Sequence, residues 1–153
     1  MKIIQSIFLS FIIAFTVTSG YATVATATDD NGVILAGHDV VAYFTKSTPV
    51  KGSAEFTALH DGAIYQFASA ENRDFFRANP GQYAPTYGGY CAFGTSLGKK
   101  FEVDGKAFEI VEKRLYVNKN LKVYKTWSKD IPNNIVKAER QWPKIKNVPA
   151  SEL

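Results

Sequence analysis

Hydrophobic and polar residues alternate most regularly on either side of the Asp61-Gly62 pair, which is a typical two-residue turn of a β-hairpin. With this turn, His60 faces Ala63, and residues farther from the turn face one another in order. Because side chains alternate between the two faces of a strand, one face of the hairpin is apolar and is expected to be buried. That face carries Phe56, Ala58, Tyr65 and Phe67, with Phe56 opposite Phe67 and His60 at its end.

Capping residues predict two short helices beside this hairpin. Asp39 precedes an apolar run that starts at Val40, and its carboxylate can accept hydrogen bonds from the N–H groups of a first helical turn. Ser69 precedes a second helix over residues 70–78, which the Asn79-Pro80-Gly81 sequence ends. The adjacent aromatic residues of this helix, Phe75 and Phe76, are expected to pack inward.

A second strand pair is predicted over residues 108–118, turning about Glu112-Lys113. Glu-Lys is poor chemistry for a tight turn, so a slightly longer loop is an alternative there. The apolar face of this pair carries Phe108, Ile110, Leu115 and Val117, while Glu109 and Arg114 lie on the other face.

Two further helices are predicted after this strand pair. Asn118 is expected to cap the first, in which apolar residues recur at helical spacing. Pro132 fits the first turn of the last helix, which Pro143 closes. The apolar side of the last helix carries Ile131, Ile135, Ala138 and Trp142. Because strands and helices follow one another without a repeating βαβ order, the sequence predicts an α+β fold, with short antiparallel hairpins packed with several short helices in a single small domain.

The first 27 residues have the pattern of a signal peptide. Lys2 supplies a positive charge, residues 3–17 are mostly apolar, and the segment ends in the small-residue triplet Ala25-Thr26-Ala27. The apolar run is shorter than the ~20 residues that a membrane-spanning helix needs, so we expect cleavage after Ala27 rather than an uncleaved anchor. Cleavage after Ala22 is an alternative.

The rest of the chain has the size of one domain. We expect a flexible lead-in over residues 28–36, a folded domain over 37–147 and a tail over 148–153, exported to the periplasm and not inserted in the membrane after cleavage. The 18 Lys and Arg residues are scattered among 14 Asp and Glu residues, so nucleic acid is excluded as a partner, whereas a protein partner is left open. The single cysteine cannot form an intramolecular disulfide.

Several separated motifs resemble the YHS domain family. They are Gly62-Ala63-Ile64-Tyr65-Gln66-Phe67-Ala68-Ser69 and Asn79-Pro80-Gly81-Gln82-Tyr83, with Phe75 or Phe76 between them. The flanking sequences Gly37-His38-Asp39-Val40-Val41-Ala42-Tyr43-Phe44 and Tyr87-Gly88-Gly89-Tyr90-Cys91-Ala92 are similar to the exported, single-domain bacterial form. The resemblance covers about Gly37 to Trp142, which is most of the chain after the leader.

The resemblance implies a metal-binding module, with copper as the metal, since relatives occur as small modules in copper-transporting ATPases and in some phenol hydroxylases. In the cysteine-bearing form of the family, two cysteines lie around the strand–helix junction, at the positions of Ala68 and Asn72 here. Neither of these side chains binds a soft metal, so the chain departs from the family at that place. His38 is a second departure, because this subfamily usually resembles Gly-Tyr-Asp there.

Four residues remain as candidate metal ligands: Cys91, His38, Asp39 and His60. A thiolate and an imidazole suit Cu(I), and Asp39 could orient the imidazole of His38. We therefore predict a non-catalytic module that binds or handles copper, with Cys91 and His38 as its main ligands. The alternatives are that Cys91 is a small buried apolar residue and that His60 is a partly exposed histidine at the hairpin end.

The aromatic Gly-Gly-Tyr-Cys loop supports a second hypothesis, a module that binds a small ligand or a protein partner. Flat apolar rings with hydroxyl groups would form its surface, and the alternative is an ordinary aromatic core. A Cys91–His38 dyad oriented by Asp39 is a third hypothesis, a thiol enzyme, and we favour binding over catalysis. The residues of the ligand or partner surface are Tyr43, Tyr87, Tyr90 and Phe93.

Overall fold

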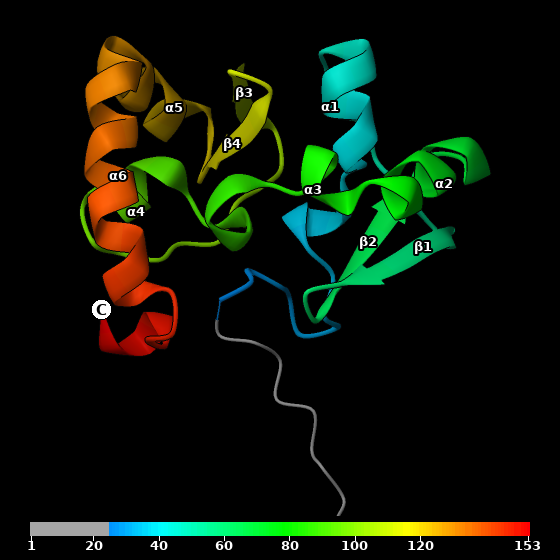
Figure 1. Cartoon of the computed structure of the whole chain (residues 1–153), viewed down its shortest axis with the longest axis horizontal. Helices are drawn as coiled ribbons and strands as arrows, with labels where there is room; N and C mark the ends of the chain where they lie inside the picture. The colour runs from blue at the N-terminus through cyan, green and yellow to red at the C-terminus, as the bar shows by residue number, and fades with distance from the viewer. Residues whose placement is uncertain (1–24) are drawn as a thin grey trace, which may run out of the picture.

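The computed structural model of the chain describes residues 25–153, and it confirms the predicted α+β class (Figure 1). The predicted signal peptide lies outside the described residues, except for Ala25, Thr26 and Ala27. No helix in the described part is both long enough and apolar enough to cross a membrane. Figure 1 shows helices α1–α3 and one hairpin on one side of the molecule, helices α4–α6 on the other side, and a second hairpin between them.

Strands β1 (Ser53–His60) and β2 (Ala63–Phe67) form the first hairpin, and their turn at Asp61-Gly62 is as predicted. His60 pairs with Ala63, and Ala58 pairs with Tyr65. The expected pairing of Phe56 with Phe67 is wrong, because the register shifts between Ser53 and Thr57 and places Ser53 opposite Phe67. An irregularity of this kind adds residues to one strand near its end, and the alternation of side chains alone does not reveal it.

Helices α1 (Val40–Lys46) and α2 (Ala70–Ala78) begin where their capping residues predict. Within α2, Phe76 is buried, but the expected burial of Phe75 is wrong, because that ring is 49% exposed. Two adjacent helical positions are about 100° apart around the helix, so a single contact face cannot cover both rings. A short helix α3 (Pro80–Tyr83) follows directly.

Strands β3 (Ala107–Val111) and β4 (Arg114–Asn118) form the second hairpin with the predicted pairing. The turn is the tight two-residue one rather than a longer loop, and Glu112 and Lys113 take positive φ angles of 50° and 62°. Positive φ at both central residues matches the twist of the strands, although neither residue type favours it. The charged Lys113 is thereby fixed at the tip of the hairpin, next to Arg114.

Helices α4 (Ala92–Ser96), α5 (Leu121–Trp127) and α6 (Ile131–Ile145) make up the C-terminal region. The expected cap of α5 is wrong: Asn120 caps it, because Asn118 is paired in β4 and its side-chain oxygen accepts the N–H of Phe93. The expected end of α6 is also wrong, since Pro143 lies inside the helix, which continues to Ile145. Four short 3-10 turns, η1 (Leu35–Gly37), η2 (Thr86–Gly89), η3 (Ser128–Asp130) and η4 (Ala150–Glu152), complete the described elements.

Strand β4 separates two clusters of buried side chains. Leu115 and Val117 belong to a first cluster, which contains the β1–β2 hairpin, α1 and Phe76. Tyr116, on the opposite face, belongs to a second cluster with Tyr87 and Trp127. Because both faces of β4 are covered, this strand is the common wall of the two halves of the domain.

Residues 28–36 pack against the domain, unlike the flexible lead-in that we expect from the sequence. Ile34 and Leu35 are buried in the first cluster, and Val33 bridges to Ile64 of β2. The backbone N–H of Ile34 also donates to the carbonyl of Ile64. Apolar residues in this short stretch therefore cover one end of the hairpin.

Candidate functional site

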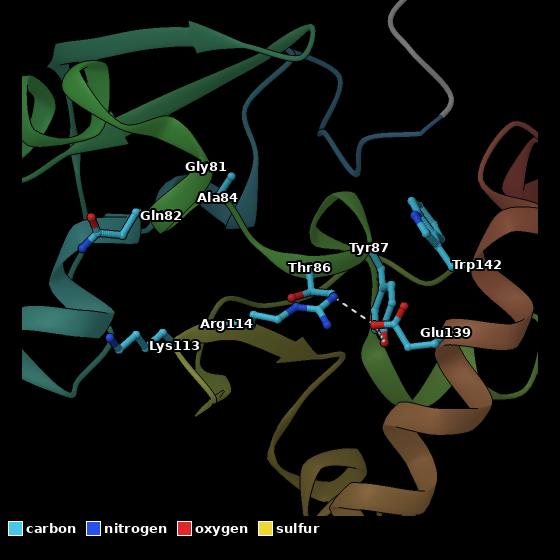
Figure 2. Close-up of a pocket in the computed structure, with 9 residues that line it drawn as sticks. All are labelled: Gly81, Gln82, Ala84, Thr86, Tyr87, Lys113, Arg114, Glu139 and Trp142. Carbon is cyan, nitrogen blue, oxygen red and sulfur yellow. Dashed lines mark hydrogen bonds and ion pairs between the residues drawn. The ribbon is translucent and has the colours of Figure 1, made fainter.

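A pocket of about 240 Å³ lies where η2, the β3–β4 turn, α6 and the residues around α3 come together (Figure 2). Its volume is below the range of drug-sized sites, so it suits a small ligand. It combines aromatic walls with several polar groups, and its lining residues are Gly81, Gln82, Ala84, Thr86, Tyr87, Lys113, Arg114, Glu139 and Trp142.

The backbone of η2 places Tyr87 in this pocket. Tyr87 and Gly88 both have left-handed conformations, with φ angles of 55° and 61°. A residue other than glycine costs of order 1–3 kcal/mol in such a conformation, and the surrounding packing has to hold it there. The ring of Tyr87 packs between Tyr116 at 5.9 Å and Trp142 at 5.7 Å, measured between ring centroids. The strained turn therefore fixes the direction of this phenol.

A cluster of polar side chains on one side of the pocket consists of Tyr87, Arg114 and Glu139. The hydroxyl of Tyr87 donates to Oε1 of Glu139 at 3.2 Å, and Nη2 of Arg114 lies 2.9 Å from the same oxygen. Burial, and then the neighbouring Glu139 carboxylate, raise the pKa of Tyr87, so its phenol stays a hydrogen-bond donor at neutral pH. The side chains of Arg114 and Glu139 are 49% and 46% exposed, so their ion pair is open to water.

Lys113 brings a second positive charge to the pocket. Figure 2 shows Lys113 and Gln82 at one end of the view, Tyr87 and Glu139 at the other, and Arg114 beside Thr86 between them. Within residues 25–153, the ammonium group of Lys113 makes no ion pair or hydrogen bond. The pocket thus has two cations and a single carboxylate, and that carboxylate already accepts from Tyr87 and pairs with Arg114.

Cys91 is a buried structural residue rather than an exposed thiol. Its side chain is the N-cap of α4, where Sγ accepts the N–H of Gly94 at 3.3 Å. The sulfur also lies 3.7 Å from Oδ1 of Asn118. Burial raises the pKa of this thiol, so the thiolate that would bind Cu(I) or attack a substrate is disfavoured. Among the described contacts of Cys91 there is none with His38 or His60.

His38 lies at a different place and is also buried. Its Nδ1 is 2.9 Å from the carbonyl oxygen of Leu35, which can only accept, so Nδ1 carries a proton and the neutral ring has this nitrogen as its donor. Burial lowers the pKa of His38, which favours this neutral form. The ring sits against Gly105, where a Cβ would come within 2.2 Å of Nδ1. His38 therefore acts as a packed residue that ties η1 to the loop before β3.

His60 and Asp39 are likewise engaged elsewhere. Nε2 of His60 lies 3.4 Å from the carboxylate of Asp61, and its ring packs edge-on against Phe76. Asp39 is fully buried and is the cap that the sequence predicts for α1. Its carboxylate accepts four hydrogen bonds, from the N–H groups of Val41, Ala42 and Ala68 and from Nδ2 of Asn72.

The four candidate metal ligands are thus not brought together as a cluster. In the described part of the chain, no group of three or more His, Cys, Asp or Glu side chains could hold a metal ion. Ala68 and Asn72, which take the places of the cysteines in the resembling family, both donate to Asp39 instead. Copper binding through Cys91 and His38 stays a prediction, and these contacts do not favour it.

The four aromatic residues expected at a ligand surface have different positions. Tyr43 is a core residue and not a surface one, because it is fully buried and its hydroxyl donates to the carbonyl of Gly105 at 2.5 Å. Phe93 packs partly buried against the second cluster, and Tyr90 is 8% exposed beside Trp142 and Lys100. Of the four, Tyr87 lines the pocket described above.

Sequence reasoning missed the charged residues of this pocket. Arg114 lies in a strand and Glu139 in a helix. Exposure to solvent is enough to explain a charged residue at either position. Nothing in their spacing connects them with Tyr87, and the contact arises only when side chains of α6 and of the second hairpin meet in the second cluster. The signal that sequence does give is the glycine pair after Tyr87, which permits the left-handed turn.

Comparison with known proteins finds no family model, no curated protein and no solved structure that matches this chain. The resemblance to the YHS domain family therefore stays a prediction that rests on the motifs quoted above.

Proposed function

We propose that this protein is an exported, non-catalytic binding module, and that the pocket beside Tyr87 binds a small oxyanion such as a carboxylate or a phosphate. The observation that carries the proposal is the charge of the pocket. Lys113 has no counter-ion within the described residues, and the one carboxylate present, Glu139, is already paired with Arg114. An anionic ligand would supply the negative charge that the protein itself does not place there.

The groups around the pocket suit such a ligand. A guanidinium presents several N–H donors in one plane and recognises carboxylate and phosphate groups well. Nη2 of Arg114 pairs with Glu139, and Cζ of the same guanidinium lies over the ring of Tyr116, 5.4 Å from its centroid. This orients the guanidinium before a ligand arrives, which reduces the entropy lost on binding. Tyr87 and Trp142 offer apolar surface to the remainder of a small molecule.

Binding is favoured over turnover because the pocket has no activated nucleophile among its lining residues. Cys91 does not line it, and burial keeps the thiol protonated. The phenol of Tyr87 is a hydrogen-bond donor, as its raised pKa keeps it neutral. The thiol-enzyme hypothesis therefore gains no support from these positions.

Calorimetric titration of the protein with acetate and with inorganic phosphate tests the proposal. Lys113→Gln should weaken binding of the preferred anion roughly tenfold, as expected for the loss of one charge-assisted hydrogen bond. Lys129→Gln is the matched control, because Lys129 is exposed in η3 and lies outside the pocket. That variant should change the affinity less than about twofold. Equal effects of the two substitutions, or no binding of either anion, would contradict the proposal.

A further inference from the structure

Residues 25–27 form a short segment, here called the N-terminal strap, that lies against η2. The backbone N–H of Ala27 donates to the carbonyl of Gly88 at 2.9 Å. The hydroxyl of Tyr90 donates to the carbonyl of Thr26 at 3.4 Å, and Oγ1 of Thr26 donates to the carbonyl of Asp61 at 3.1 Å. The strap therefore connects the turn that carries Tyr87 with the turn of the first hairpin.

Gly88 is shaped to receive this strap. A Cβ on Gly88 would lie 1.8 Å from the carbonyl oxygen of Ala25, and its three nearest neighbours would all belong to Ala25 and Thr26. Ala27 is itself only 6% exposed. The positive φ angle at position 88 already favours glycine. Because glycine has no Cβ, Gly88 also leaves the space that the strap occupies.

We infer that the leader is cut before Ala25, so that the mature protein keeps the N-terminal strap. This inference rests on the proposed export. A cut after Ala27 would remove all three hydrogen bonds, leave the carbonyl of Gly88 without its partner and uncover the turn next to the pocket. The sequence offers a suitable earlier site, because Gly20-Tyr21-Ala22 has the small-x-small pattern that signal peptidase accepts. The mature chain would then begin at Thr23.

Intact-mass measurement of the protein purified from the envelope fraction tests the inference directly and needs no variant. A mass corresponding to residues 23–153 is the expected result. A chain that begins at Thr28 would overturn this inference and leave the proposed export in place. A chain that retains Met1 would overturn both. Anion binding by the pocket is measured separately, so its failure would not be confused with either outcome.

A pair of glycine variants tests whether the strap lies on Gly88 in the exported protein. Gly88→Ala and Gly98→Ala both place alanine at a positive φ, 61° and 73°, but a Cβ on Gly98 would meet nothing closer than the side chain of Gln141 at 3.7 Å. With the strap present, Gly88→Ala should lower the melting temperature by roughly 5 °C or more beyond the loss in Gly98→Ala, because only the former adds a clash. Equal losses in the two variants would mean that no strap covers Gly88 and would overturn the inference.

Discussion

Two carboxylates, one on each side of β4, have opposite environments in this domain. Asp39 belongs to the half with the first hairpin, is fully buried, and accepts hydrogen bonds with both of its oxygens. Glu139 belongs to the half with α6, is 46% exposed, and uses Oε1 for both Tyr87 and Arg114. The first is closed to any further partner, whereas the second borders a pocket.

This difference separates a structural acid from one at a binding site. A carboxylate has about four positions for hydrogen-bond donors, and Asp39 fills them with groups from α1, from the end of β2 and from α2. Burial of such a group is tolerated because each donor is satisfied as well. The carboxylate of Glu139 is shared between Tyr87 and Arg114, and its side chain is about half exposed, so a ligand can compete for these two donors. The two carboxylates therefore differ in how completely their hydrogen-bonding positions are filled.

The largest effect that follows from this comparison concerns Asp39. We expect Asp39→Ala to lower the free energy of unfolding by at least about 3 kcal/mol, since it removes the cap of α1 and leaves the donors of Ala68 and Asn72 unsatisfied. Ser69→Ala is the control, because it removes one capping bond, to the N–H of Asn72, and should cost about 1 kcal/mol. Urea unfolding measures both. Similar losses would show that the hydrogen bonds of Asp39 with Ala68 and Asn72 contribute little.

The same comparison explains which features the sequence predicts. Local signals act over a few residues, and they locate the caps of α1 and α2 and the turns of both hairpins correctly. Phe56 and Phe75 are misplaced because a register shift and the choice of buried helix face depend on the neighbouring elements. The pocket needs Tyr87, Arg114 and Glu139 from three elements, and no local pattern predicts such a contact.

The two halves should respond together to alkaline pH. Burial raises the pKa of Tyr43 and Tyr65 in the first cluster and of Tyr87 in the second. The unfolded chain loses these protons near pH ~10, whereas the folded chain keeps them, so stability is complete below that pH and falls as the pH rises above it. Circular dichroism and phenolate absorbance should therefore change together. Ionisation of these three tyrosines near pH ~10 with the fold intact would contradict their burial.

The last and smallest effect tests whether Glu139, unlike Asp39, can still interact with a further partner. Glu139→Gln keeps an oxygen that can accept from Tyr87 and Arg114, and the ion pair that it removes is half exposed, so the free energy of unfolding should fall by less than about 1 kcal/mol. Because the substitution also removes the only carboxylate that lines the pocket, it should strengthen phosphate or acetate binding by a few fold, opposite in sign to Lys113→Gln.

Glu55→Gln, at an exposed position of β1, is the control for the change in net charge and should leave the affinity nearly unchanged. Urea unfolding and calorimetric titration of the two variants give both quantities on the same samples. A loss in Glu139→Gln as large as that in Asp39→Ala would mean that both carboxylates are closed structural groups. Unchanged anion affinity in Glu139→Gln would place the ligand away from the pocket, because a charge lining the site has to act on an anion bound in it.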